Sequence, residues 1–163
     1  MSCSDDDFLN DVWTLYFHDP ANTDWNLKSY VNVITFSSVS EYASVAKAIN
    51  EKVNRGMFFM MREHVFPCYD DKANINGGCF TIKVSNADAG EFWNEMCVRS
   101  LSESLFGPST QNELVNGISI SPKRGFCIFK VWMAACPEEE IDPARLKLPK
   151  GVVGDVMFKL WLD

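Results

Sequence analysis

Two aromatic residues on predicted loops, with an acid directly after the second, are the residues of this chain best suited to bind a ligand. Trp25 lies in the segment Asp24–Leu27, and Tyr69 with Asp70 lies in the segment Phe66–Asp71; both segments are rich in turn-forming residues. Large rings on loops can hold a flat ligand between them. A carboxylate offers only acceptors, which match the adjacent N1–H and N2–H donors of guanine. The pattern therefore predicts a purine site, and methylation at guanine N7 would strengthen stacking because it makes the base cationic.

Composition limits the organisation of the chain and its partners. With 163 residues, 47% hydrophobic and 13% aromatic, the chain is long enough for one domain with a sizeable core. We assign residues 1–11 to a disordered or weakly ordered acidic N-terminal segment and residues 12–163 to the single domain. The net charge of −7 argues against general attraction to the phosphate backbone of long nucleic acids. Any contact with nucleic acid must therefore be local.

The sequence offers no membrane segment and no metal motif. It contains no run of 18 apolar residues, and its start is acidic where a signal peptide would be basic, so we expect a cytoplasmic protein without membrane association. The six cysteines form no CxxC pair and have no close histidine partner, so reduced packing thiols are expected rather than zinc or a redox pair. The sequence requires no cofactor.

Hydrophobic periodicity predicts strands that alternate with amphipathic helices. The expected strands are Val12–Phe17, Ser29–Phe36, Met57–Met61, Cys79–Val84 and Val156–Leu162, with a hairpin over Gly117–Ala134. Helices are predicted after the capping boxes Ser38–Glu41 and Asp88–Glu91, and a third from Pro137 through Glu138–Glu140, interrupted at Asp142–Pro143. This order predicts an α+β domain in which helices pack on one face of an antiparallel sheet.

The second arm of the predicted hairpin has one polar face. Because side chains alternate along a strand, Ile128, Lys130 and Trp132 point one way and Phe129, Val131 and Met133 the other. A lysine beside a tryptophan on one sheet face predicts a solvent-filled groove.

The chain resembles the mRNA cap-binding proteins of the eukaryotic initiation factor 4E family, from about Val12 to Gly154. The residues that carry this resemblance, in order, are Trp13, Trp25, Pro67-Cys68-Tyr69-Asp70, Gly77-Gly78, Phe92-Trp93, Gly117 and Trp132. The resemblance implies a curved antiparallel sheet backed on its convex face by three α-helices, with the cap bound on the concave face.

By this resemblance, Trp25 and Tyr69 sandwich 7-methylguanine, Asp70 accepts hydrogen bonds from its N1 and N2 donors, and Trp132 lies against the N7-methyl group. Tyr69 stands where the family usually has a second Trp, and Asp70 where it usually has Glu. The smaller ring and the shorter acid imply modestly weaker binding.

The phosphate-binding positions depart further from the family. Cys79 stands where the family often has Arg, and Ile128 where it has Lys. Lys123 aligns with the phosphate-binding Arg, and Arg124 and Lys130 are the nearby candidates. Because Lys lacks the planar fork of Arg, weaker phosphate contacts are implied.

The family's helical side binds a tyrosine-containing helical peptide of a scaffold initiation factor of the 4G type or of a repressor protein. The corresponding positions here are Val39, Ala43, Asn94 and Val98. Because Ala43 replaces a Trp anchor, the resemblance implies poor binding of the usual partners and suggests a specialised one.

Three functional hypotheses follow. The first is a non-catalytic module that binds the 7-methylguanosine cap of mRNA in translation initiation or its regulation. The second is a protein-interaction or translational-repressor paralogue that keeps the fold but binds the cap weakly. The third, a nucleotide-processing enzyme, is disfavoured because no metal cluster or placed nucleophile is evident.

Without the resemblance, each tryptophan would be interpreted as a packing residue, and Trp13 and Trp93 are expected in the core. His18 and His64 are isolated on turn-like segments and receive no catalytic role.

Overall fold

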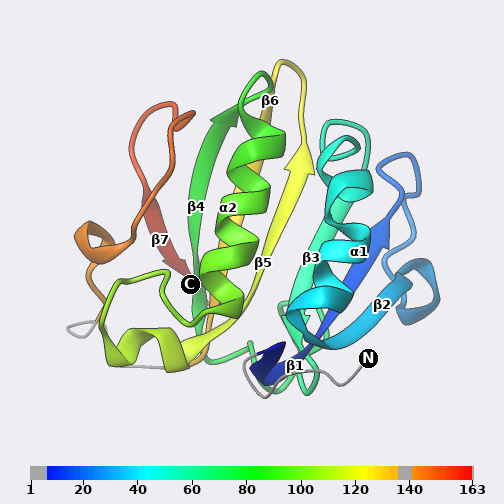
Figure 1. Cartoon of the computed structure of the whole chain (residues 1–163). Coiled ribbons are helices and arrows are strands. Elements are labelled where there is room, and N and C mark those ends of the chain that lie inside the picture. Colours follow the sequence, from blue (N-terminus) through cyan, green and yellow to red (C-terminus); the bar gives the residue numbers. More distant parts are fainter. Residues whose placement is uncertain (1–6, 136–140, 163) are drawn as a thin grey trace.

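A single antiparallel sheet of seven strands organises the computed structural model, which describes residues 7–135 and 141–162. The strands are β1 (Phe8–His18), β2 (Val31–Ser38), β3 (Met57–Arg62), β4 (Gly78–Ser85), β5 (Val115–Pro122), β6 (Phe126–Met133) and β7 (Met157–Leu160). They are arranged in the order β2-β1-β3-β5-β6-β4-β7 (Figure 1). The first strand begins before the expected start at Val12, and β7 forms one edge of the sheet.

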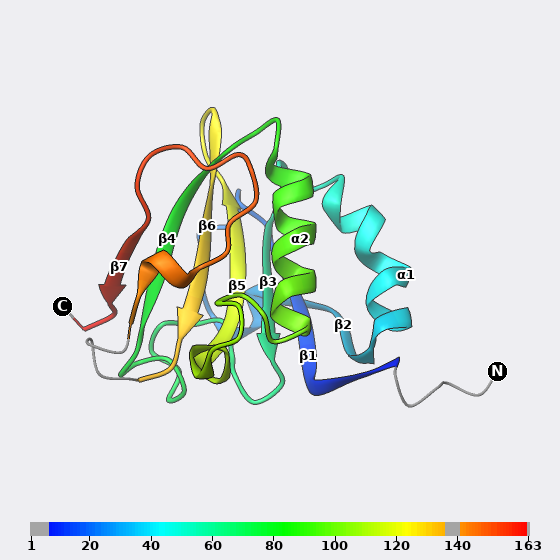
Figure 2. The ribbon, with the colours of Figure 1, turned by 60° about the vertical axis from the view of Figure 1, so that its left-hand side comes forward.

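Two α-helices, α1 (Val39–Asn50) and α2 (Ala89–Leu101), cover one face of the curved sheet (Figures 1 and 2). Short 3-10 helices occur at η2 (Leu27–Ser29), η3 (Thr110–Leu114) and η5 (Pro143–Arg145). The predicted α+β class is therefore confirmed. Among the described residues, no helix combines the length and apolar character needed to cross a bilayer.

The segment of the predicted third α-helix is described only from Ile141 onward. Most of it, Pro137 to Glu140, lies outside the described residues, and beyond Asp142 the chain makes only the single turn η5. The Asp142 side chain accepts a hydrogen bond from the Ala144 amide at 3.0 Å, which starts this turn. The turn ends where Leu146 adopts an extended conformation and buries its side chain in the core. η5 is therefore a single turn that ends at the buried Leu146.

The two predicted capping boxes have different outcomes. At α1, Ser38 Oγ accepts from the Glu41 amide at 3.3 Å, and Glu41 Oε1 accepts from the Ser37 amide and the Ser38 hydroxyl. At α2, Asp88 makes no side-chain cap bond. Its Oδ2 instead accepts from the Ser85 hydroxyl at 2.7 Å, so this carboxylate ties the end of β4 to the helix start.

Apolar side chains pack on both faces of the sheet. The larger cluster lies between the sheet and the helices and includes Trp13, Trp93 and Phe129, so both tryptophans expected in the core are buried there. A smaller cluster includes Phe59 and Trp132. Because Phe129, Val131 and Met133 belong to the larger cluster while Trp132 belongs to the smaller one, the predicted two-faced character of β6 is confirmed.

Candidate ligand-binding site

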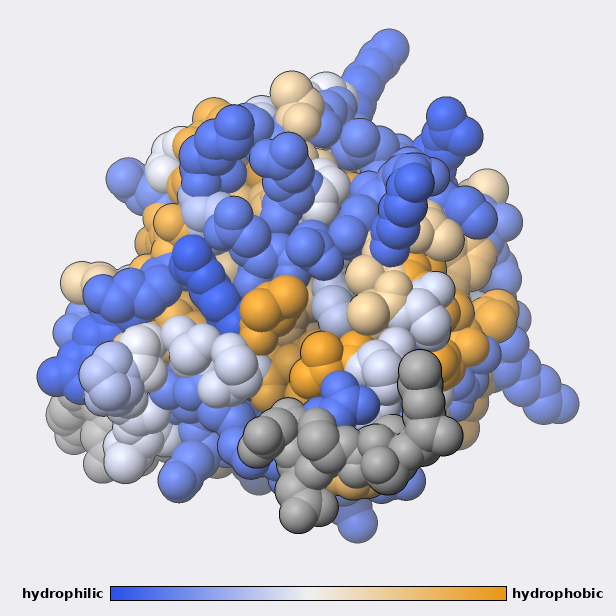
Figure 3. All heavy atoms as spheres, viewed as in Figure 1, coloured by the Kyte–Doolittle hydropathy of each residue, from blue (hydrophilic) through white to orange (hydrophobic). Residues whose placement is uncertain are grey.

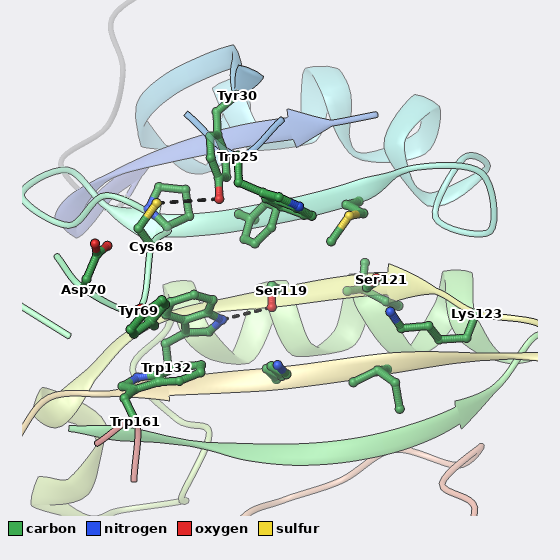
Figure 4. A pocket seen from close by; sticks show the side chains of 16 residues that line it. Trp25, Tyr30, Cys68, Tyr69, Asp70, Ser119, Ser121, Lys123, Trp132 and Trp161 are labelled. Atoms are coloured by element: carbon green, nitrogen blue, oxygen red, sulfur yellow. Dashed lines mark hydrogen bonds between the residues drawn. The ribbon is translucent and has the colours of Figure 1, made fainter. Parts of the chain in front are cut away.

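A cavity of about 520 Å³ lies over the sheet strands, with the helices behind them in Figure 4. Six of the seven cap-binding candidates from the sequence line it: Trp25, Tyr69, Asp70, Lys123, Lys130 and Trp132. The remaining candidate, Arg124, is exposed in the turn between β5 and β6 and is not among the lining residues. The fold therefore brings together side chains from two separate loops and from the β5–β6 hairpin.

Trp25 forms one wall of this cavity, and it rests on a buried histidine. The Trp25 and His18 rings are stacked with centroids 3.8 Å apart and an interplanar angle of 5°. His18 Nε2 donates to the Asp24 carbonyl oxygen at 2.9 Å, because a carbonyl oxygen can only accept. Tyr30 meets the His18 ring edge-on at 5.1 Å. These contacts fix one indole face and leave Trp25 49% exposed, so its other face is open to a ligand.

Turn hydrogen bonds hold the loop that carries Trp25. The Asn26 side-chain oxygen accepts from the amides of Lys28 and Ser29, which caps η2. Asp24 in turn accepts from the Asn26 amide and side chain. The turn-forming residues seen in the sequence therefore place the ring through local backbone bonds.

Tyr69 lies on the second loop, beside two tryptophans. Tyr69 is 55% exposed, and its ring centroid is 6.2 Å from that of Trp161. Trp161 in turn packs on Trp132 at 4.9 Å. Trp132 is buried and donates its Nε1–H to Ser119 Oγ at 2.9 Å, which fixes its orientation at the cavity floor (Figure 4).

The second loop is held by a buried asparagine. Asn74 Nδ2 donates to the carbonyl oxygens of Phe66 and Cys68, at 3.0 and 2.8 Å. The Cys68 thiol also donates to the Tyr30 hydroxyl at 3.6 Å, which connects the two loops. Burial raises the pKa of both groups, so both are protonated at neutral pH. Asp70 itself is exposed at the cavity lining, where its acceptors can reach a ligand.

The cationic side of the cavity is sparse. Within the described residues, Lys123 and Lys130 are the basic side chains that line it, and Ile128 contributes an apolar surface between them. Cys79, which stands at a usual Arg position, is buried with its sulfur 3.7 Å from Thr81 Oγ1. Lys130 reaches the cavity as its place in the strand alternation predicts.

The four partner-binding candidates lie on the two helices. Val39 and Val98 are each 49% exposed, and Ala43 is exposed on α1. Asn94 is half-buried, and its Oδ1 accepts a 2.7 Å hydrogen bond from the Tyr42 hydroxyl. The helical face is mostly hydrophilic, with separate hydrophobic patches (Figure 3). The hydrogen bond between Tyr42 and Asn94 links α1 to α2, and it occupies the side-chain oxygen of Asn94.

Sequence reasoning missed two residues of the cavity region. His18 received no role, although it stacks on Trp25, and Trp161 was interpreted as a packing residue, although it lines the cavity. The signal for His18 was its place at the end of the predicted strand just before the loop of Trp25. For Trp161, the signal was the alternation of side chains along the last strand. This alternation could not show which side chains face the cavity as long as the strand that pairs with it was unknown.

These features define a class of α+β domain in which helices cover one face of a curved antiparallel sheet and aromatic side chains line a cavity on the other. The family model of eukaryotic initiation factor 4E matches residues 8–150, and the chain belongs to this family.

Curated relatives agree with this assignment. Eukaryotic translation initiation factor 4E-1 of Schizosaccharomyces pombe is 31% identical over 137 residues, which cover 79% of this chain and 61% of that protein. Eukaryotic translation initiation factor 4E of Candida glabrata is 25% identical over 142 residues, or 82% of this chain and 66% of the relative. The chain thus spans less than two thirds of the length of these relatives.

Solved structures share the fold. Ascaris suum eIF4E-3 in complex with the m2,2,7G cap matches with a TM-score of 0.78 at 14% identity, covering 95% of this chain and 91% of that one. Schistosome eIF4E in complex with m7GpppA and 4E-BP matches with a TM-score of 0.72 at 21% identity, covering 82% and 75%.

Proposed function

We propose that this chain binds the 7-methylguanosine cap of mRNA and acts in translation initiation or its regulation. The observation that carries the proposal is the convergence of Trp25, Tyr69 and Asp70, from two loops, on one cavity. In the proposed complex, the cationic base stacks between the two rings, and Asp70 accepts hydrogen bonds from N1–H and N2–H. Trp132 lies against the N7-methyl group. The exposed face of Trp25 and the exposed Tyr69 ring support this arrangement.

The phosphates are proposed to meet Lys123 and Lys130. Two ammonium groups supply point charges but no bidentate fork, so the phosphate chain contributes less to affinity than it would opposite arginines. This sparse cationic lining, with the net charge of −7, favours a second candidate: a protein-interaction or translational-repressor paralogue with weak cap affinity.

A titration that follows tryptophan fluorescence distinguishes the two candidates. If the chain binds the cap, 7-methyl-GTP quenches emission more strongly than GTP, because the cationic base stacks better on Trp25. Equal or absent responses contradict cap binding and favour the interaction paralogue.

The Asp70→Asn variant tests recognition of the base. We expect it to lower affinity for 7-methyl-GTP by about 1–3 kcal/mol, because one guanine donor then faces an amide NH2 group or loses its acceptor. Isothermal titration calorimetry measures the change. Glu63→Gln is the matched control, since it removes one negative charge from an exposed residue that is not among the cavity lining. Unchanged affinity for Asp70→Asn would show that this carboxylate does not read the base.

The helical face is proposed to bind a scaffold initiation factor of the 4G type or a repressor protein. Since Ala43 offers no large anchor and Asn94 already accepts from Tyr42, we expect weak binding of a helical Tyr-x-x-x-x-Leu peptide. Ala43→Trp is expected to raise that affinity about tenfold, a gain of roughly 1.4 kcal/mol. Fluorescence anisotropy of a labelled peptide measures both values.

Ala48→Trp is the control for the peptide experiment, because this alanine is also exposed on α1 but lies on a different side of the helix. Tight binding by the parent chain, or an equal gain from both variants, would contradict the proposed role of Ala43.

A further inference from the structure

The C-terminal strand, which lies beyond the segment that matches the family model, brings a further tryptophan to the cavity. β7 pairs with β4 so that Lys159 is opposite Cys79, and the Trp161 amide donates to the Gly77 carbonyl oxygen at 3.1 Å. Because side chains alternate along the strand, Phe158 packs with the helix-side core while Trp161 emerges on the cavity side. Trp161 accordingly lines the same cavity as Tyr69 (Figure 4).

The pair Gly77-Gly78 allows this close approach. A Cβ atom at Gly77 would meet the Met133 carbonyl oxygen at the end of β6, and one at Gly78 would meet the Lys159 carbonyl oxygen. Both obstacles are backbone atoms, which cannot rotate away. The absence of a side chain at Gly78 therefore lets β7 lie against β4, and its absence at Gly77 lets the chain pass close to the end of β6.

Three cavity residues meet around the Trp161 ring. Its centroid is 4.9 Å from that of Trp132 and 6.2 Å from that of Tyr69. The Lys130 ammonium lies over the ring, with Nζ 5.5 Å from the centroid. Within the described residues the buried Trp161 Nε1 has no hydrogen-bond partner, so ring contacts and strand pairing hold this side chain. Trp161 thus connects the aromatic and the cationic parts of the cavity.

We propose that Trp161 is a positioning residue of this cavity, which supports Tyr69 from behind and holds the Lys130 ammonium toward the phosphates of the ligand. The inference rests on the proposed cap binding. Tyr69 is exposed, and its ring is smaller than that of the usual Trp. Packing against Trp161 limits the motion of this ring in the free protein, so less conformational entropy is lost when a base stacks on it. The Lys130 ammonium is similarly confined by its contact with the Trp161 ring, so this side chain loses less conformational entropy when it binds phosphate.

Calorimetric titration of Trp161 variants tests the proposal. Trp161→Leu is expected to weaken 7-methyl-GTP binding about tenfold, and Trp161→Phe to keep most of the parent affinity because it retains a ring. The loss is expected to be smaller for 7-methylguanosine, which has no phosphates for Lys130. Leu162→Ala is the control, since this neighbouring side chain is 64% exposed. Parent-like affinity of a folded Trp161→Leu variant overturns the proposal.

A double-mutant cycle isolates the effect exerted through lysine. In a Lys130→Met background, Trp161→Leu is expected to cost less affinity for 7-methyl-GTP than in the parent, because the cation that it positions is gone. Strictly additive losses overturn the lysine part of the proposal.

A measurement without ligand separates this inference from the proposed function. In the NMR spectrum of the free protein, the ring current of Trp161 is expected to move the Lys130 Cε protons upfield, and Trp161→Leu to abolish the shift. Lys130→Met identifies the signal. If the parent fails to bind 7-methyl-GTP, the proposed function fails, while an upfield shift still supports the placement of Lys130. Absence of the shift in the parent overturns the inference.

Discussion

Trp25→Leu is expected to lower affinity for 7-methyl-GTP by about 1–3 kcal/mol, the loss typical of removing one stacked aromatic ring. One face of Trp25 lies on His18 at 3.8 Å, and its exposed side belongs to the cavity lining. A leucine at this position can still cover part of the histidine, but it offers no π surface to a cationic base. Isothermal titration calorimetry with 7-methyl-GTP measures the change.

The control for Trp25→Leu is Leu27→Ala, on the same loop, where the side chain is 68% exposed and not among the cavity lining. Because Trp25 is itself half-exposed, its replacement should lower the free energy of unfolding only slightly. A variant that stays folded and binds 7-methyl-GTP like the parent would show that Trp25 is not a stacking platform.

Features of the fold that depend only on residues close together in the sequence were predicted correctly. The Ser38–Glu41 capping box begins α1 as expected, because both side chains bond to backbone only a few residues away. The alternation along β6 placed Lys130 and Trp132 in the cavity, because a strand sends successive side chains to opposite faces. These predictions succeeded because they required no knowledge of distant partners.

The parts that depend on distant pairing were not predicted. Trp161 reaches the cavity only because β7 pairs with β4, whose residues lie about eighty positions earlier, and a local pattern carries no record of that pairing. Asp88 likewise resembled a helix cap, yet its Oδ2 accepts from Ser85, and its Oδ1 lies 3.9 Å from Nζ of the distant Lys150. The stacking role of His18 was not predicted, because the chain must reverse direction after β1 to bring Trp25 onto the histidine ring. At such positions the contacts of a side chain are set by the tertiary structure, and the local sequence is compatible with more than one of them.

The second large expected effect is on stability, and it concerns Arg62, a buried arginine on β3. Arg62 Nη1 and Nη2 donate to the two Glu103 carboxylate oxygens, each at 2.7 Å, and Nη1 also meets Asp11 Oδ2 at 3.2 Å. Nε donates to the Val115 carbonyl oxygen at 2.6 Å, and the guanidinium lies 4.6 Å from the Trp13 ring centroid. Burial alone would lower the pKa of Arg62, but its hydrogen bonds to Glu103 and Asp11, together with their negative charges, raise it. This network joins β1, β3 and the start of β5 to the turn after α2.

Glu103→Gln is expected to lower the free energy of unfolding by about 2–4 kcal/mol, because a charged guanidinium then stays buried with only Asp11 as its counter-charge. The substitution keeps the size and branching of the side chain, so the loss reports charge rather than packing. Urea denaturation followed by circular dichroism measures it. Glu113→Gln is the matched control, since Glu113 lines the same surface cavity as Arg62 and Glu103 but is exposed. Equal stability of the two variants would contradict a structural role for the Arg62–Glu103 pair, whereas a loss confined to Glu103→Gln would identify this pair as the charge contact that holds the turn after α2 against the sheet.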